Sequence, residues 1–370
     1  MKVLMVGGGS GGHVFPLIAI QQQLHTLDRS IESVIVSDVL ADDVKNEFNH
    51  GTRFKMIKSG KIRRFAHWKW YDYFKPNRYK FYLFNLIDVF KLIIGGIQSL
   101  KILLTEKPDV VFAKGGYVSV PIGLVASWLN IPLILHDSDT RLGIANKLLA
   151  RRATKLLLGM ERTDSDDNPV VGIPVREAFF DLDKATSKSK LGIDSGKPLL
   201  LITGGSLGAK RINILFEEHL QDLVNGYEIV HISGVGDYDR LSKVTEKIKE
   251  GYNLHPFVSS DYPALVAAAD VVVGRAGATS IAEFAAAGVA SIFIPNSYLT
   301  DQVSNTNWLI AHNAGLVIEE SGRTEIELMD ALEKLKTESV RNGYAHKIHK
   351  LAIRDSAKKV AQYIIKGAKG

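Results

Sequence analysis

Short apolar runs recur along the chain and are separated by longer segments in which polar and apolar positions are mixed. The runs predict buried strands at 3–6, 31–37, 110–113, 132–135, 198–203, 229–233, 254–258, 271–273 and 292–294. The segments between them predict helices, of which an amphipathic one at 16–28 is the first. This alternation is typical of βαβ units, so we expect an α/β fold with parallel sheets.

A glycine-rich loop follows the first predicted strand. Gly7–Gly12 leads to His13, and Pro16 is expected to open the next helix. Glycines let the backbone turn sharply and let a ligand come close, and the amide groups at a helix start favour a phosphate or another oxyanion. The loop also fits the dinucleotide-binding pattern G-x-G-x-x-G. The alternative is a tight turn beside a surface histidine.

The second half of the chain restarts this pattern. Gly204-Gly205-Ser206 follows a predicted strand in the same way as Gly8-Gly9-Ser10, and further glycine-rich loops stand at 114–117 and 274–280. Ligands of doubly wound sheets bind at the carboxyl ends of the strands, where such loops gather. The repetition predicts a pair of Rossmann-like, doubly wound parallel-sheet domains that face each other across a cleft.

Composition places the domain boundary and narrows the class of protein. The polar stretch 161–169 divides the chain into expected domains 1–164 and 165–345, with a C-terminal helix at 346–370 that packs back on the first domain.

The 370 residues include no cysteine, which excludes thiolate catalysis and zinc–thiolate sites. The chain starts in a strand without a signal sequence, so we expect a cytosolic protein.

Basic and aromatic residues are interleaved over 61–84, where three of the aromatic positions are Trp68, Trp70 and Tyr71. This mixture suits a surface that lies on an anionic membrane, and it would equally suit single-stranded nucleic acid. We favour the membrane. For 85–104 we expect a long core helix with a solvated basic edge. The apolar run 81–104 is interrupted too often by polar residues to span a bilayer.

Several polar side chains are candidates for chemistry. His13 suits a general base, and Glu283 can accept from ribose hydroxyls or act as a capping partner of Thr279 or Ser280. Asp38 follows the second strand, where a dehydrogenase would hold its ribose.

Asp137 and Asp139 follow a strand in the first domain. We favour helix capping before 141–150 over a metal site for this pair.

Six ordered blocks carry a resemblance to a known family: 8–16 (GGSGGHVFP), 115–119 (GGYVS), 172–176 (GIPVR), 204–206 (GGS), 275–283 (RAGATSIAE) and 285–288 (AAAG). In these blocks the chain resembles the MurG family, the UDP-N-acetylglucosamine–lipid I N-acetylglucosaminyltransferases of peptidoglycan synthesis, which have the GT-B fold. The resemblance extends over nearly the whole chain. It implies an inverting transfer of GlcNAc from UDP-GlcNAc to the MurNAc 4-hydroxyl of lipid I.

The resemblance also implies the roles of individual residues, with His13 as the catalytic base and no cofactor or metal. Implied donor-binding residues are Ser10, Gly11, Gly12, Asp139, Arg176, Ser206, Val258, Ala278, Thr279, Ser280, Ile281, Ala282, Glu283 and Gln302. Implied acceptor-binding residues are Gly9, Ser10, Gly11, Gly12, Gly115, Gly116 and Tyr117. The implied partners are UDP-GlcNAc, undecaprenyl-linked lipid I and the anionic membrane surface at 61–84, without nucleic acid. The protein would be peripheral, at the cytoplasmic face of the cell membrane.

This chain departs from the family pattern in three places. It has His136-Asp137-Ser138-Asp139 where the family has His-Glu-Gln-Asn, Leu207 where the family has glutamine, and Ser10 where threonine is usual. Three alternatives remain: a GT-B enzyme with a different lipid acceptor, a nucleotide-dependent oxidoreductase that uses Asp38, and a non-catalytic nucleic-acid-binding protein.

Overall fold

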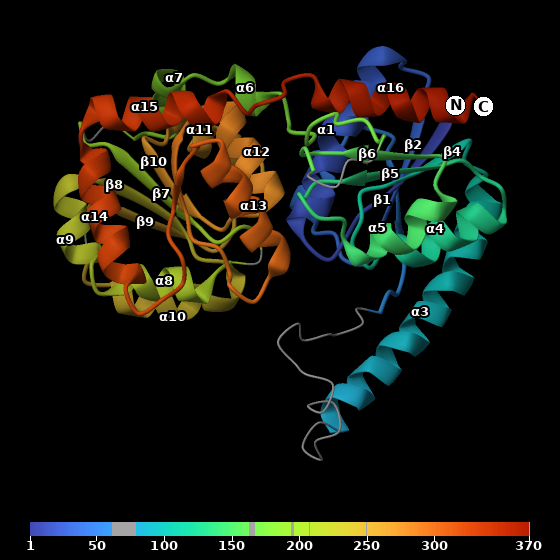
Figure 1. The fold of residues 1–370 in the computed structure, drawn as a ribbon, viewed down its shortest axis with the longest axis horizontal. Helices are drawn as coiled ribbons and strands as arrows, with labels where there is room; N and C mark the ends of the chain where they lie inside the picture. Colours follow the sequence, from blue (N-terminus) through green and yellow to red (C-terminus); the bar gives the residue numbers. More distant parts are fainter. Residues whose placement is uncertain (61–78, 163–166, 194–195, 207, 249, 370) are drawn as a thin grey trace. The chain divides into compact units, whose positions relative to one another are not determined.

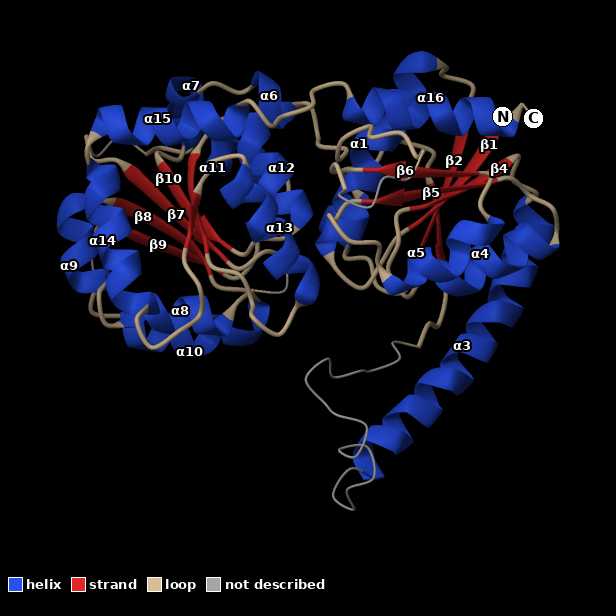
Figure 2. Ribbon diagram, in the orientation of Figure 1, coloured by secondary structure: helices blue, strands red, loops and turns tan. Residues whose placement is uncertain are grey.

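The computed structural model describes residues 1–60, 79–162, 167–193, 196–206, 208–248 and 250–369, without the side chains of 79–82. Within these residues the chain forms two compact units. The first comprises Met1–Pro174 and Asp355–Gly370, and the second comprises Val175–Arg354. Figures 1 and 2 show that each unit is a twisted sheet with helices packed around it.

The first unit alternates strands and helices along the chain. Its strands are β1 (Lys2–Val6), β2 (Glu32–Ser37), β3 (Arg53–Met56), β4 (Val110–Ala113), β5 (Leu133–Asp137) and β6 (Lys155–Leu158). Its helices are α1 (Gly11–Leu27), α2 (Asp42–Lys45), α3 (Tyr79–Glu106), α4 (Ser119–Trp128), α5 (Ile144–Leu149), the 3₁₀ turn η3 (Ala150–Arg152) and α16 (Ser356–Ala368).

The described strands of this unit form a parallel sheet in the order β3-β2-β1-β4-β5-β6. The order reverses between β1 and β4, which lie side by side with Val3 opposite Val110. Both strands are almost entirely buried, so helices must cover both faces of the sheet. The loops that follow β1 and β4 therefore meet at the topological switch point, where ligands bind in folds of this kind.

The second unit repeats the architecture. Its strands are β7 (Leu199–Thr203), β8 (Glu228–Ile232), β9 (Tyr252–His255), β10 (Val271–Gly274), β11 (Ala290–Phe293) and β12 (Leu316–Val317). Its helices are α6 (Ala178–Asp181), α7 (Lys184–Lys190), α8 (Lys210–Glu217), α9 (Leu220–Gly226), α10 (Val235–Thr245), α11 (Tyr262–Ala268), α12 (Ala278–Ala287), α13 (Thr300–Ala311), α14 (Thr324–Lys336) and α15 (Glu338–His349).

Its described strands are again all parallel, in the order β12-β11-β10-β7-β8-β9. Here the switch point lies between β7 and β10, where Leu200 is opposite Val271. The core on one side of this sheet includes Phe216, Tyr227 and Ile292, all fully buried. The prediction of two doubly wound parallel sheets is confirmed.

The first unit extends ten residues beyond the expected boundary at 164. Val170 pairs with Leu158, and His136 Nε2 lies 2.9 Å from the Gly172 carbonyl, so this stretch is tied to the edge of the first sheet. The expected C-terminal helix at 346–370 is two helices. α15 packs against α12 and β11 of the second unit, whereas α16 packs against α1 and the first sheet (Figure 1).

The first helix begins earlier than its sequence indicates. α1 starts at Gly11, so Pro16 lies inside the helix and not at its opening position. The amide groups of Gly11 and Gly12 consequently belong to the first turn. Most of the helix is buried, including Leu17, Ile18 and Ile20, because α16 covers its outer side. A helix over 16–28 was expected and is present as far as Leu27, but its expected start at Pro16 and its expected amphipathic character were wrong.

The expectation of a core helix over 85–104 was wrong. α3 exposes many large apolar side chains, and Figure 1 shows its N-terminal half projecting beyond the rest of the first unit. The exposed ones are Leu83, Phe84, Leu86, Ile87, Val89, Phe90, Ile93, Ile94, Ile97 and Leu104. A continuous exposed apolar surface marks a contact with another molecule or with a membrane. No described helix is both long enough and apolar enough to cross a bilayer.

The packing of α16 yields a stability prediction. Ile364 is fully buried on this helix. Replacing it with alanine leaves a cavity, so Ile364→Ala should lower the free energy of unfolding by about 2–5 kcal/mol in urea denaturation. Gln362→Ala, an exposed position on the same helix, is the matched control and should have little effect. Equal stability of the two variants would contradict the docking of α16.

Candidate active site

Two glycine loops meet at the carboxyl edge of the first sheet. Gly115 and Gly116 have φ values of 96° and 76°, a conformation that glycine adopts without strain. A Cβ atom at Gly116 would lie 3.1 Å from Nε2 of His13. The loop after β4 therefore lies directly against the imidazole in the first turn of α1. The structure brings together the predicted base and the predicted acceptor loop.

Asp38 fixes both loops from the end of β2. Its Oδ1 accepts from the Gly9 amide at 2.9 Å, and its Oδ2 accepts from the Tyr117 hydroxyl. A Cβ atom at Gly9 would lie only 2.6 Å from the Tyr117 ring, so only glycine fits there. Burial, followed by the hydrogen bond to Asp38, raises the pKa of Tyr117. The Tyr117 phenol therefore stays protonated and serves as a donor.

The loop after β5 is held by Asp137. Its carboxylate accepts from the Asp139 amide at 3.2 Å, the Gly143 amide at 2.9 Å and Asn146 Nδ2 at 2.8 Å. Asp137 thus holds the loop that leads into α5, but the expected helix capping by Asp137 and Asp139 was wrong, because the N-cap residue of α5 is Gly143 and no side chain caps it. Its neighbour His136 is fully buried, and burial together with the positive charge of Lys114 holds the pKa of His136 well below its usual range.

In the second unit, polar side chains gather beyond the ends of β7 and β10. Arg176 is buried, donates to the Ser259 carbonyl at 3.3 Å and lies over the Phe179 ring. Burial is the main cause that raises the pKa of Tyr262. The Glu283 carboxylate raises this pKa further, whereas Thr203 and Arg176 lower it. Tyr262 therefore lies among Thr203, Glu283 and Arg176.

The first turn of α12 does not form a capping box. The N-cap residue is Gly277, and no side chain caps it, so Thr279 and Ser280 lie inside the first turn. Ala278 and Ile281 are buried, and Ala282 is partly exposed. Glu283 is buried one turn further along. The alternative in which Glu283 pairs with an N-cap at Thr279 or Ser280 was wrong.

Polar contacts with neighbouring segments hold the loop that precedes α12. Arg275 Nη1 donates to the Ile294 carbonyl at 3.0 Å and to Glu320 at 2.7 Å. Asn305 of α13 donates to the Ala276 carbonyl at 3.1 Å. Gln302, one turn earlier on α13, accepts from the Asn296 amide at 2.8 Å. Arg275 and Asn305 thus fix the loop before α12, and Gln302 fixes the loop before α13.

The glycine loop after β7 rests against the end of β8. A Cβ atom at Gly208 would lie 2.5 Å from the Ser233 carbonyl oxygen, so the two loops touch. Asn213 of α8 donates to the same carbonyl at 3.0 Å and to Asp237 at 2.8 Å. Ser206 of this loop is partly exposed, and Val258 lies in the loop after β9.

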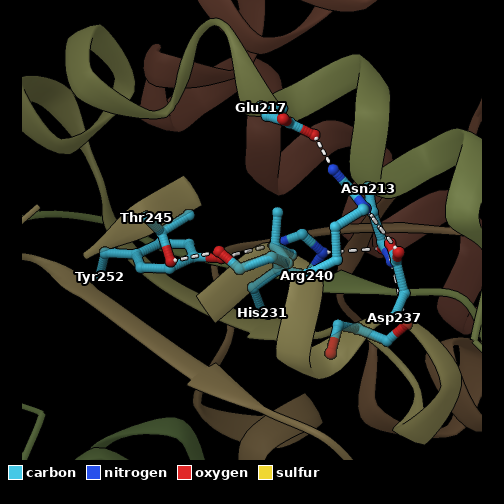
Figure 3. Close-up of polar contacts among 9 residues, drawn as sticks. Asn213, Glu217, His231, Asp237, Arg240, Thr245 and Tyr252 are labelled. Carbon is cyan, nitrogen blue, oxygen red and sulfur yellow. Dashed lines mark hydrogen bonds and ion pairs between the residues drawn. The ribbon is translucent and has the colours of Figure 1, made fainter. Parts of the chain in front are cut away.

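A buried polar network supports these two loops (Figure 3). His231 lies 3.0 Å from Asn213 Oδ1 through Nε2 and 3.0 Å from the Tyr252 hydroxyl through Nδ1. Arg240 donates to both oxygens of Asp237 and to Glu217. Burial lowers the pKa of His231 to about 3, so the imidazole is neutral in the folded protein.

The predicted residues fall into two sets. Those in the first unit lie at the β1–β4–β5 edge: Gly9, Ser10, Gly11, Gly12, His13, Gly115, Gly116, Tyr117 and Asp139. Those in the second unit lie in loops and helix starts beyond the strand ends: Arg176, Ser206, Val258, Ala278, Thr279, Ser280, Ile281, Ala282, Glu283 and Gln302. Sequence reasoning missed Lys114 and Tyr262. A charged residue directly after an all-apolar strand could have signalled Lys114.

Both halves of the chain match domains of a known glycosyltransferase family. Residues 3–158 match the glycosyltransferase family 28 N-terminal domain, and residues 199–362 match the glycosyltransferase family 28 C-terminal domain. Crystal structures of Acinetobacter baumannii MurG (TM-score 0.69, 23% identity, 99% of each chain) and of the calicheamicin glycosyltransferase CalG4 (TM-score 0.67, 14% identity, 100% of this chain and 98% of that one) share the fold. The fold is that of a GT-B glycosyltransferase.

A curated relative identifies the family within this class of glycosyltransferases. The UDP-N-acetylglucosamine–N-acetylmuramyl-(pentapeptide) pyrophosphoryl-undecaprenol N-acetylglucosamine transferase of Clostridium kluyveri is 33% identical over 99% of this chain and 99% of its own length. The chain therefore belongs to the MurG family of glycosyltransferases.

The buried His231 predicts a pH dependence of stability. The unfolded imidazole takes up a proton near pH 6.5, whereas the folded one resists protonation down to about pH 3. Stability should therefore fall as the pH drops from 6.5 towards 3, with a slope of about 1.4 kcal/mol per pH unit from this group. In His231→Gln, urea unfolding between pH 6 and 4 should show a shallower slope.

His346→Gln is the control, because His346 is exposed on α15. Parallel pH profiles for His231→Gln and the unchanged protein would contradict the neutral, buried state of His231.

Proposed function

We propose that the protein transfers GlcNAc from UDP-GlcNAc to the MurNAc 4-hydroxyl of lipid I, inverting the anomeric configuration. The match to the Clostridium kluyveri transferase over 99% of both chains carries this proposal. The geometry is consistent with it, because each unit presents a glycine loop at the switch point of a parallel sheet.

The acceptor is assigned to the first unit. The first turn of α1, which contains Gly11 and Gly12, directs its positive dipole end to a phosphate, and Gly115–Tyr117 supplies the second loop. Asp38 keeps the Gly9 amide and the Tyr117 hydroxyl in place. Because that amide already donates to Asp38, we assign the phosphate contacts to the residues after Gly9.

The donor is assigned to the second unit. The start of α12, from Ala278 to Ser280, would hold the diphosphate, and Glu283 would accept from the ribose hydroxyls. The buried guanidinium of Arg176 would offset the charge that develops on the departing UDP. Ser206, Val258 and Gln302 would complete the contacts to the nucleotide and sugar. The family resemblance also assigns Ser10, Gly11, Gly12 and Asp139 of the first unit to the donor.

Catalysis then requires a base for the acceptor hydroxyl. His13 lies against Gly116 in the acceptor loop, so its imidazole is close to the place where the acceptor would bind. As the base, it would take the proton of the 4-hydroxyl while that oxygen attacks the anomeric carbon and the bond to UDP breaks. No cofactor is needed, because the diphosphate leaves with both bonding electrons.

The lipid tail of the acceptor calls for contact with a bilayer. The exposed apolar face of α3 suits insertion at the depth of the headgroups of an anionic leaflet, as a peripheral contact at the cytoplasmic face. Most of the basic and aromatic stretch 61–84 lies outside the described residues, so the face of α3 carries this part of the proposal.

The oxidoreductase alternative loses its main support. Asp38 was its ribose-binding candidate, but the Gly9 amide and the Tyr117 hydroxyl occupy both carboxylate oxygens. A direct assay distinguishes glycosyl transfer from the oxidoreductase alternative. Incubation of the purified protein with UDP-GlcNAc and a lipid I analogue should yield the disaccharide lipid. Thermal stabilisation by NAD but not by UDP, with no transfer, would overturn the proposal.

The role of His13 gives a kinetic prediction. His13→Ala should lower kcat by about 10²–10⁴-fold, the usual contribution of a general base, while the Kd for UDP stays within about twofold. Stopped assays and calorimetric UDP titration measure the two quantities. His25→Ala, an exposed histidine near the other end of α1, is the control and should keep full activity. Equal losses of kcat and UDP affinity in His13→Ala would exclude the base role.

The face of α3 gives a membrane prediction. Ile93 and Ile97 are 56% and 67% exposed one helical turn apart. The double variant Ile93→Ser/Ile97→Ser should reduce partitioning onto anionic vesicles at least roughly tenfold, because two apolar side chains no longer enter the bilayer. Vesicle sedimentation measures this. Val235→Ser, at a position that is 72% exposed in the second unit, should bind as the unchanged protein does. Unaltered binding by the double variant would exclude this face.

A further inference from the structure

Lys114 is a buried cation beside the proposed acceptor loop. It is the first residue after β4 and is only 2% exposed, and its backbone amide donates to the Val6 carbonyl at 3.0 Å. Its Nζ donates to Ser138 Oγ in the loop after β5. Lysine is rarely buried so completely, because removing the ammonium from water is unfavourable.

The carboxylates of Asp137 and Asp139 face this ammonium. Asp137 is buried, and it also accepts from the Asp139 amide, the Gly143 amide and Asn146, so it does not depend on Lys114 alone. An apolar side chain at position 114 would avoid the desolvation but would leave these carboxylates without their positive neighbour. A buried ammonium directly before a binding loop indicates a functional role.

The position of Lys114 indicates what that role is. The next two residues, Gly115 and Gly116, form the loop that lies against His13 and carries the proposed acceptor diphosphate. Electrostatic interactions are stronger in a buried, low-dielectric environment than in water. A fixed ammonium there would favour a dianionic group held by this loop.

Building on the proposed function, we propose that Lys114 is the fixed positive charge of the acceptor site, stabilising the bound acceptor diphosphate through its field and not by direct contact. It is thus a positioning residue for the acceptor. The charged and titratable groups that face it are Asp137, Asp139 and His136. Burial is the main cause that lowers the pKa of Lys114 to about 8, and the two carboxylates oppose this effect.

The pH dependence of acceptor binding tests the proposal. At saturating UDP-GlcNAc, the KM for a short-chain lipid I analogue should rise between pH 7 and 9 as Lys114 loses its charge. In Lys114→Met this KM should be roughly tenfold higher at pH 7, equivalent to about 1.4 kcal/mol, and should not change with pH. The KM for UDP-GlcNAc should be unaffected.

Two further variants distinguish an effect of the Lys114 charge on the acceptor KM from an effect of Lys114 on the loop structure. Lys2→Met removes one charge at the opposite end of β1, where Lys2 contacts Glu106, and should leave both KM values unchanged. Ser138→Ala removes the hydrogen-bond partner of Lys114 but keeps the charge, so its acceptor KM should retain the rise above pH 7. If Ser138→Ala behaved like Lys114→Met, Lys114 would only anchor the loop, and the proposal would be overturned.

The stability of the variants is a second readout. Lys114→Met should unfold at a lower temperature, because Asp137 loses its positive neighbour, but the folded variant should keep the unchanged KM for UDP-GlcNAc. An acceptor KM that is independent of pH in the unchanged protein would overturn the role of Lys114 even if Lys114→Met fails to fold. Absence of any transfer by the unchanged protein would instead overturn the proposed function.

Discussion

Every part of the candidate site depends on the parallel direction of the strands. When all strands of a sheet run the same way, all loops that follow them emerge at one edge, and helices must cover both faces. In the first unit this constraint gathers the ends of β1, β2, β4 and β5. Residues separated by a hundred positions, such as Gly9 and Tyr117, therefore come into contact. Asp38 then joins these two loops through a single carboxylate.

Close packing at that edge also explains where glycine is needed. A Cβ atom at Gly9 would overlap the Tyr117 ring, and one at Gly116 would press on the His13 imidazole. The second unit has the same arrangement at Gly208, which abuts the Ser233 carbonyl. In each unit, the glycines that suggest phosphate binding are also those that let neighbouring loops touch. Ligand approach and loop packing therefore both require glycine at these positions.

Nine of the twelve described strands could be predicted from the sequence, with ends within about three residues, because strands buried on both faces read as continuous apolar runs. The strands β3, β6 and β12 were missed. The start of α1 could not, since Gly11 and Gly12 are poor helix formers and the pattern pointed to Pro16. The exposed face of α3 was missed for a different reason. Apolar periodicity on a helix is the same whether that face meets a core or another surface.

Glycine loops and their flanking histidine or glutamate gave the sequence signal for the candidate site, as for His13 and Glu283, whose roles stay predictions. Asp38 was noticed but assigned to a ribose, because only the folded chain shows that two loops use both of its oxygens.

The two units use buried polar groups in opposite ways. In the second unit, His231, Asn213 and Asp237 satisfy one another, the imidazole is neutral, and the Asp237 carboxylate is paired with Arg240. Such a network fixes loop positions. In the first unit, Asp137 accepts from neutral donors, and Lys114 adds a buried ammonium that faces Asp137 and Asp139. This ammonium lies in the unit to which the phosphate-bearing acceptor is assigned, so we attribute the unfavourable desolvation of Lys114 to acceptor binding.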